Sequence, residues 1–163
     1  MTPKRSLLII FACILLLCGC GGDDVVYSEF HDLPSDGWRR MTVLSFDPCP
    51  FDSATDIGSH EIEIILRHND AIPYDSLWVA VEETSFGTTI HRDTIPVALS
   101  NAEGEWLGRG THGVYEVSKS LRTYKRLPSG YEITLGHAMK QERIPGIINV
   151  GIRMKRFNNH ENR

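Results

Sequence analysis

The sequence predicts an all-β protein: an antiparallel, jelly-roll-like β-sandwich of about seven or eight strands, preceded by an N-terminal lipoprotein signal peptide. Three observations lead to this prediction. Apolar and polar residues alternate along several short segments, which is the pattern of strands with one buried face. Clusters of Pro, Gly, Ser and Asp separate these segments and indicate turns. The first twenty residues have the composition of an export leader.

The leader begins with Lys4 and Arg5 and continues with an uncharged apolar run over residues 7–17. This run is shorter than the ~20 residues needed to cross a bilayer core, and it fits the apolar segment of a signal peptide. The following Leu17-Cys18-Gly19-Cys20 resembles a bacterial lipobox, in which the Cys20 thiol accepts the lipid. A plain secretory leader is the alternative. We expect a signal peptide at 1–19, a lipidated tether at 20–24, a sandwich domain at 25–157 and a polar tail at 158–163.

The strand candidates follow in order along the rest of the chain. The clearest is the segment 61–67, where Ile62, Ile64 and Leu66 share one face of the strand. Pro96 has no backbone N–H, so its strand should lie at a sheet edge or carry a bulge. A short helix is expected only at 115–122. The strand candidates are residues 25–30, 41–47, 61–67, 77–82, 95–100, 131–135 and 148–155.

The half-polar alternation gives each predicted sheet one apolar face. Two such sheets must bury these faces against each other, which yields a β-sandwich. After cleavage of the leader, Cys49 is the only cysteine besides Cys20, so no disulfide within the domain is expected. We interpret Cys49 as a partly buried apolar residue rather than a reactive thiol.

Composition and motifs argue against several functions. The formal charge of −4, with no basic stripe, argues against nucleic acid as a partner. The segment Gly108-Arg109-Gly110-Thr111-His112-Gly113 matches G-x-G-x-x-G, but it lacks the preceding apolar strand and following helix of a dinucleotide site. The seven histidines show no metal-binding spacing, and His31 and His68 are interpreted as surface or turn residues. We therefore expect no cofactor, no metal site and no enzymatic activity.

Aromatic residues beside turns or on polar faces are the candidate contact surface. Leu77 and Val79 occupy the opposite face from Trp78, which should therefore be exposed. Exposed aromatic side chains can stack on sugars or anchor a partner protein; alternatively, these residues close the ends of the core. The candidate contact residues are Tyr74, Trp78, Trp106, Gly108 and Gly110.

Several segments together resemble the gliding-motility lipoprotein GldH family. They are the stretch from Arg67 to Trp78, the Gly-x-Trp-Leu-Gly-x-Gly pattern at 104–110, the strand from Gly130 to Met139 and the ending at 144–153. The resemblance covers nearly all of the mature chain in order. Three positions, Ile72, Ser76 and Asn149, depart from the family pattern.

The resemblance implies a cell-envelope lipoprotein of Bacteroidetes, linked to gliding and to the type IX secretion apparatus, without enzymatic activity. Our leading hypothesis is a lipid-anchored, non-catalytic accessory or scaffold component with envelope proteins as partners. The outer membrane is the expected location, and either of its faces remains open. The alternatives are a surface glycan-binding lipoprotein and a hydrolase whose site is assembled by the fold.

Overall fold

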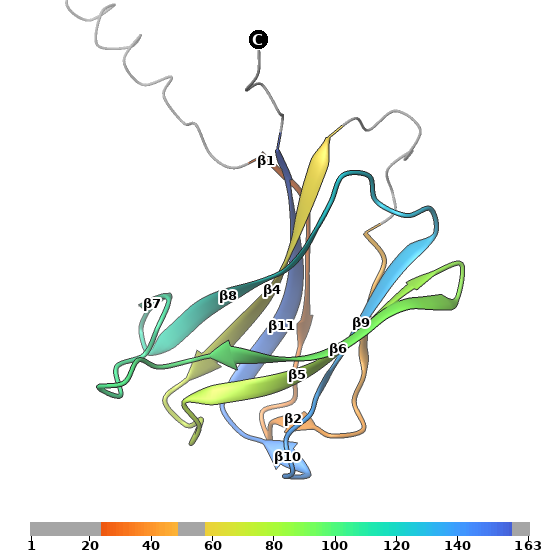
Figure 1. Ribbon diagram of the computed structural model, residues 1–163. Coiled ribbons are helices and arrows are strands. Elements are labelled where there is room, and N and C mark those ends of the chain that lie inside the picture. The colour runs from red at the N-terminus through yellow and green to blue at the C-terminus, as the bar shows by residue number, and fades with distance from the viewer. Residues whose placement is uncertain (1–23, 49–57, 158–163) are drawn as a thin grey trace, which may run out of the picture.

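The computed structural model describes residues 24–48 and 58–157. This part of the chain forms eleven strands and no helix (Figure 1). The predictions for the signal peptide, for Cys20 and Cys49, and for the tail at 158–163 lie outside the described residues. The strands are β1 (Asp24–Asp32), β2 (Trp38–Arg39), β3 (Leu44–Phe46), β4 (Ser59–Asn69), β5 (Ser76–Ser85), β6 (Thr88–Ala98), β7 (Arg109–Thr111), β8 (Val114–Tyr124), β9 (Tyr131–His137), β10 (Arg143–Ile144) and β11 (Ile147–Phe157).

The strands form two main sheets, and all their pairings are antiparallel. The five-stranded sheet has the order β1-β11-β4-β8-β7, and the four-stranded sheet has the order β3-β9-β5-β6. The short strands β2 and β10 pair separately. Without β2, β7 and β10, the remaining eight strands have the order of a jelly roll, with consecutive strands distributed between two four-stranded sheets. The predicted fold class is confirmed.

The core lies between the two main sheets. Inward side chains alternate with outward ones on β5 and β9, as the sequence pattern predicted. Burying one such Leu or Ile side chain contributes roughly 1.5–3 kcal/mol. The inward side chains of the two sheets therefore account for much of the stability. The central members are Ile62, Ile64 and Leu66 on β4, Leu77, Val79 and Val81 on β5, Tyr131, Ile133 and Leu135 on β9, and Val150, Ile152 and Met154 on β11.

The helix predicted at 115–122 is wrong, because these residues belong to the long strand β8. β8 pairs with β4 along its full length. The register shifts between Ile62 and Glu63, so that Leu121 is an extra residue on β8. This bulge interrupts the period-2 alternation by which a strand is recognised, and the cross-strand pairing overrides the local pattern.

Two other strands differ in length from the prediction. The candidate at 41–47 forms a strand only over Leu44–Phe46. The candidate at 95–100 is the end of β6, which starts at Thr88 and is mostly exposed in its first half. Pro96 lies on β6, which pairs with β5 alone among the described strands, so the predicted edge position is confirmed.

The long strands of the first sheet define two ends of the domain. At one end, a row of paired residues runs from Asp24 through Arg156 and His60 to Tyr124. We call this the leader end, because β1 begins there (Figure 1). At the opposite end, Asn69 pairs with Val114. β4 has eleven residues, so this far end lies roughly 30 Å from the leader end.

Candidate functional site

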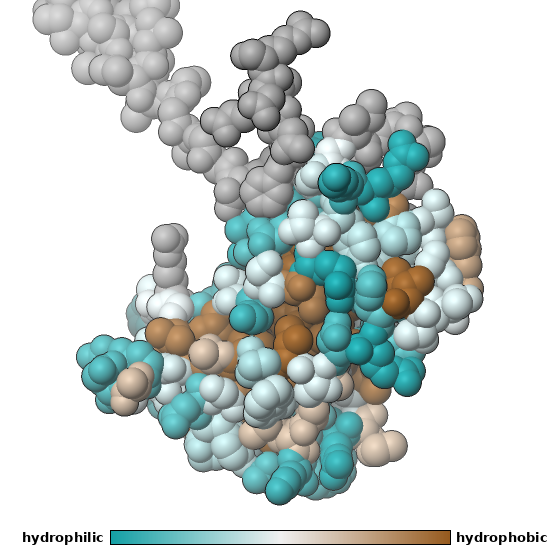
Figure 2. All heavy atoms as spheres, in the orientation of Figure 1, coloured by the Kyte–Doolittle hydropathy of each residue, from teal (hydrophilic) through white to brown (hydrophobic). Residues whose placement is uncertain are grey.

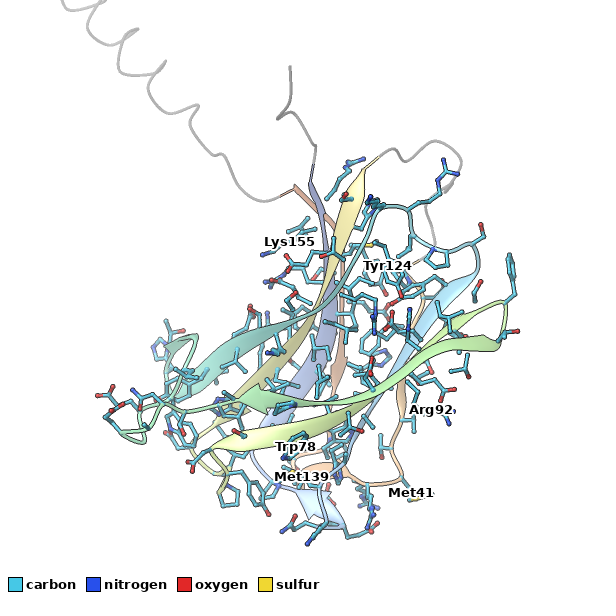
Figure 3. All side chains as sticks on the ribbon, in the orientation of Figure 1. Met41, Trp78, Arg92, Tyr124, Met139 and Lys155 are labelled. Carbon is cyan, nitrogen blue, oxygen red and sulfur yellow. The ribbon has the colours of Figure 1, made fainter. Side chains whose placement is uncertain are left out.

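Trp78 lies on the outer face of the four-stranded sheet. Its neighbours Leu77 and Val79 are fully buried, whereas 47% of Trp78 is exposed. Its backbone N–H donates to Sδ of Met139 at 3.4 Å, and the two side chains lie close together (Figure 3). The predicted outward orientation is confirmed, while a role of Trp78 in binding a partner stays a prediction. A shallow depression, the Trp78 groove, is lined by Trp78, Thr94, Ala138, Met139, Lys140 and Gln141.

Trp106 closes the far end of the core. Its Nε1–H donates to Oδ1 of Asp70 at 2.8 Å, and its half-buried ring packs edge-on against His68, with 5.0 Å between the ring centres. Tyr115 stacks on His68 at 5.5 Å and also contacts Trp106, with 6.1 Å between their ring centres. This arrangement favours the interpretation in which Trp106 seals the core, although one edge of the ring remains accessible.

His68 was expected at the surface, and this expectation is wrong. Its side chain is fully buried and contacts the rings of Trp106 and Tyr115, and burial lowers the pKa of its imidazole. His68 lies on β4, where it follows Ile62, Ile64 and Leu66 at every second residue, so strand parity already indicated an inward side chain. The neutral ring is therefore part of the core.

The remaining candidate residues have local structural roles. Tyr74 is half-buried and packs against the core just before β5. A Cβ atom on Gly108 would lie 2.0 Å from the carbonyl oxygen of Glu116, and one on Gly110 would lie 2.1 Å from that of Val114. These glycines allow the chain to run close beside β8. The structure therefore does not bring the five candidate residues into one surface.

The G-x-G-x-x-G segment forms a β-hairpin instead of a phosphate-binding loop. Residues 109–111 are β7, and His112 and Gly113 form a two-residue turn with positive φ angles of 57° and 75°. Such angles are typical of a type I′ hairpin turn. β8 follows where a dinucleotide site would need a helix.

A buried carboxylate that sequence reasoning missed connects the two sheets. Glu83 on β5 is fully buried and accepts hydrogen bonds from the hydroxyl groups of Tyr131 and Tyr124, at 2.7 and 2.5 Å. Nε of Arg122 donates to its other oxygen at 3.1 Å, and the same guanidinium also binds Asp93 at 2.7 Å. Burial, together with the Glu83 carboxylate, raises the pKa of both tyrosines. We call these residues the Glu83 cluster.

The outer face of the five-stranded sheet carries a ladder of alternating charges. Glu116 accepts from Nε of Arg67 at 2.8 Å and from Arg153 at 3.0 Å, while Lys155 lies 3.2 Å from Glu63. Burial opposes ionisation of Glu116, but the hydrogen bonds from both arginines prevail and lower the pKa of its carboxyl group. The Arg67 guanidinium also covers the Phe30 ring, 4.2 Å from its centre.

The described residues offer neither a metal-binding cluster nor a membrane-spanning helix. Over 24–48 and 58–157, no three His, Cys, Asp or Glu side chains are close enough together to hold a metal ion. In the same part of the chain, no helix is long and apolar enough to span a membrane.

The described part of the chain is a jelly-roll β-sandwich that carries the Trp78 groove on one outer face. A family model for the GldH lipoprotein matches residues 25–154. The chain therefore belongs to the GldH lipoprotein family, as the sequence resemblance indicated. It is a lipoprotein linked to gliding motility and associated with the membranes of the cell envelope.

Two curated relatives support this assignment. The gliding motility lipoprotein GldH of Flavobacterium johnsoniae is 26% identical, over 95% of this chain and 98% of the relative. A GldH homologue of Christiangramia forsetii is 22% identical, over 98% of this chain and all of the relative. Among solved structures, the Eiger TNF of S. frugiperda aligns with 85% of this chain and 96% of its own at 10% identity. Its TM-score of 0.38 is too low to support an argument.

Proposed function

We propose that the protein is a non-catalytic accessory or scaffold component of the machinery for gliding and type IX secretion. Lipid on Cys20 would hold it in the outer membrane, and the folded domain would contact other envelope proteins. The observation that carries this proposal is the Trp78 groove, in which the exposed Trp78 and Met139 lie on the outer face of the four-stranded sheet.

The position of the groove suits an anchored contact domain. Trp78 and Met139 lie away from the leader end, where the chain leading from Cys20 enters β1 (Figure 3). A lipid on Cys20 would therefore hold the leader end of the domain toward the membrane. The groove would project from the membrane toward a partner.

The described acid and base side chains also favour a structural use. Glu83 already accepts hydrogen bonds from two tyrosines and an arginine, which leaves its carboxylate engaged within the protein. The His68 side chain is fully buried and contacts two aromatic rings. Because Glu83 and His68 are both buried, each supports the fold, whereas a hydrolase would need such a group exposed to substrate.

A deletion strain complemented with single variants tests the proposal. Trp78→Ala should reduce gliding and export of type IX cargo, and should reduce copurification of envelope proteins, without changing the amount or membrane location of the protein. Phe86→Ala is the matched control, because Phe86 is an aromatic residue with 80% exposure on the β5–β6 turn. Normal gliding and normal cargo export in the deletion strain would contradict the proposal.

Glycan binding is a second candidate function, favoured by one observation. The exposed Trp78 ring lies in a groove beside the polar side chains of Thr94, Lys140 and Gln141, an arrangement that suits stacking and hydrogen bonding of a sugar. Envelope saccharides should then quench the fluorescence of the wild-type protein and not that of Trp78→Phe, which keeps the other two tryptophans. A flat titration across envelope saccharides would eliminate this function.

A further inference from the structure

The two main sheets leave an open groove between the edge of β8 and the edge of β6. β7 pairs with β8 only over Val114–Glu116, and β6 pairs only with β5. Among the described strands, none pairs with the outer edge of β8 beyond Glu116. Apolar side chains gather on this face of the molecule, between β8 and β6 (Figure 2). Residues lining the groove include Pro96, Val97 and Ala98 from β6 and Val117, Ser118 and Lys119 from β8.

The hairpin determines which backbone groups of β8 face this groove. Thr111 and Val114 flank the two-residue turn, so they form a hydrogen-bonded pair. Successive residues of a strand direct their backbone N–H and C=O groups to opposite sides. The groups that point toward the β7 side therefore belong to every second residue of β8, which are Val114, Glu116, Ser118 and Ser120. The pairing of β7 with β8 ends at Glu116. Ser118 and Ser120 therefore present backbone donors and acceptors at an edge that has no strand beside it among the described residues.

The facing edge of β6 is less suited to pairing. The N–H of Leu99 donates to the carbonyl of Asp75, and the register places Val97 opposite Leu77. Odd-numbered residues of β6 therefore direct their backbone toward β5, and Pro96 directs its nitrogen outward. Because proline has no N–H, this position interrupts the outer edge of β6. β8 is the edge that can accept another strand.

The charged side chains that line the groove indicate what kind of segment could bind there. Lys119 follows the buried Val117 at strand spacing, lines the groove, and makes no ion pair among the described residues. Arg153 and Lys155 also line the groove, but both form ion pairs with Glu116 or Glu63, so Lys119 is the cation among these described residues that remains for a ligand. A cation beside an open edge opposes pairing with a second copy of the same edge and favours a strand that carries carboxylates.

We propose that the edge of β8 binds an extended acidic segment of a partner protein, which adds a strand beside Ser118 and Ser120 and fills the groove toward β6. Backbone hydrogen bonds would hold the segment, and Lys119 would select a carboxylate. The inference deepens the proposed function and rests on it, since it specifies how an envelope partner would be bound.

Peptide binding to the full-length lipoprotein in detergent tests the proposal directly. The probe is a fluorescent ten-residue peptide of alternating Val and Glu; its comparators replace Glu by Lys or carry N-methyl groups on alternate amides. The Val–Glu peptide should bind at least tenfold more tightly than either comparator. Ser118→Pro should weaken its binding at least tenfold, whereas Ser118→Ala, which keeps the N–H, should not. Lys119→Glu should reverse the preference between Glu and Lys peptides.

Three results would overturn the inference: no binding of the Val–Glu peptide at millimolar concentration, equal affinity for Ser118→Pro and Ser118→Ala, or a dimer that Ser118→Pro dissociates. Circular dichroism and the melting temperature establish that each variant is folded. In cells, Ser118→Pro should impair gliding and Ser118→Ala should not. If Trp78→Ala impairs gliding while Ser118→Pro does not, this inference fails and the proposed function stands; if the deletion strain is normal, the proposed function fails.

Discussion

Glu82 and Glu83 are adjacent in the chain but have opposite environments. Glu82 lies on the outer face of β5 and pairs with Arg92 at 2.7 Å, whereas Glu83 points into the core. A surface ion pair contributes little, because water screens it. A buried carboxylate is costly unless hydrogen bonds satisfy it, and the Glu83 cluster provides them.

Glu83→Gln should therefore destabilise the protein, and Glu82→Gln should not. The glutamine directs an NH₂ group at donors and leaves Arg122 without its buried partner. We expect the free energy of unfolding to fall by about 2–3 kcal/mol for Glu83→Gln and to stay close to the wild-type value for Glu82→Gln. Urea denaturation measures both. Equal losses would show that the buried cluster does not contribute as described.

The buried histidines predict an acid-sensitive fold. Burial lowers the pKa of both His68 and His137 in the folded state. In the unfolded chain each imidazole returns to a pKa near 6.5, so the unfolded state binds more protons below that pH. Stability should be fully present above about pH 6.5 and should decline as the pH falls. His68→Phe combined with His137→Phe should flatten the dependence of the melting temperature between pH 7 and pH 5; an unchanged slope would refute this explanation.

At the residue scale, the sequence predicted what depends on alternation within one strand. Trp78 is outward and Leu77 and Val79 are inward for that reason. The Glu83 cluster could not be predicted in the same way, because Arg122 and Tyr124 reach Glu83 from the opposite sheet, about forty positions along the chain. Strand parity marks Glu83 as inward, but only the packing of two sheets identifies its partners.

At the scale of elements, the β7–β8 hairpin depends on glycines that the sequence associated with binding. Gly108 has a φ of +91° and no room for a Cβ, and Gly110 lies against the backbone of Val114. Gly136, on β9, has open space where its Cβ would be and carries no such constraint. Gly108 and Gly110 are therefore required by the local backbone, whereas Gly136 could be replaced by a residue with a side chain.

Gly108→Ala and Gly110→Ala should each lower the melting temperature by several degrees, corresponding to roughly 1–3 kcal/mol, while Gly136→Ala should be close to neutral. Thermal unfolding followed by circular dichroism compares the three variants. If Gly108→Ala and Gly110→Ala retained wild-type stability, a binding role for these glycines would regain support.

The elements that sequence reasoning misjudged share a physical cause. The bulge at Leu121 disrupts the alternation of β8, and the first half of β6 is polar because it is an exposed edge. Both strands form because a neighbouring strand supplies their hydrogen bonds. By contrast, β4, β5, β9 and β11 contain strong alternation in their own residues, and their positions were predicted from it.

At the scale of the whole molecule, the domain and its anchor are separate parts of one chain. The core of the sandwich is built from residues 38–154, and the segment proposed as a lipobox precedes all of it. Cys20→Ser should move the protein from the membrane fraction to the soluble fraction and abolish its activity in gliding, because attachment would depend on the lipid. The melting temperature of the domain should stay unchanged. Retention of Cys20→Ser in membranes with normal gliding would rule out the anchor.

The pairing of Asp24 with Arg156 places the entry of β1 beside the exit of β11. A reporter fused after residue 163 would consequently be only a few residues away from the anchored end, where the bilayer would shield it from antibodies and proteases. The exposed turn at 102–104 lies close to Trp106, at the far end of the domain. An epitope inserted in that turn is the better choice for learning which side of its membrane the protein occupies.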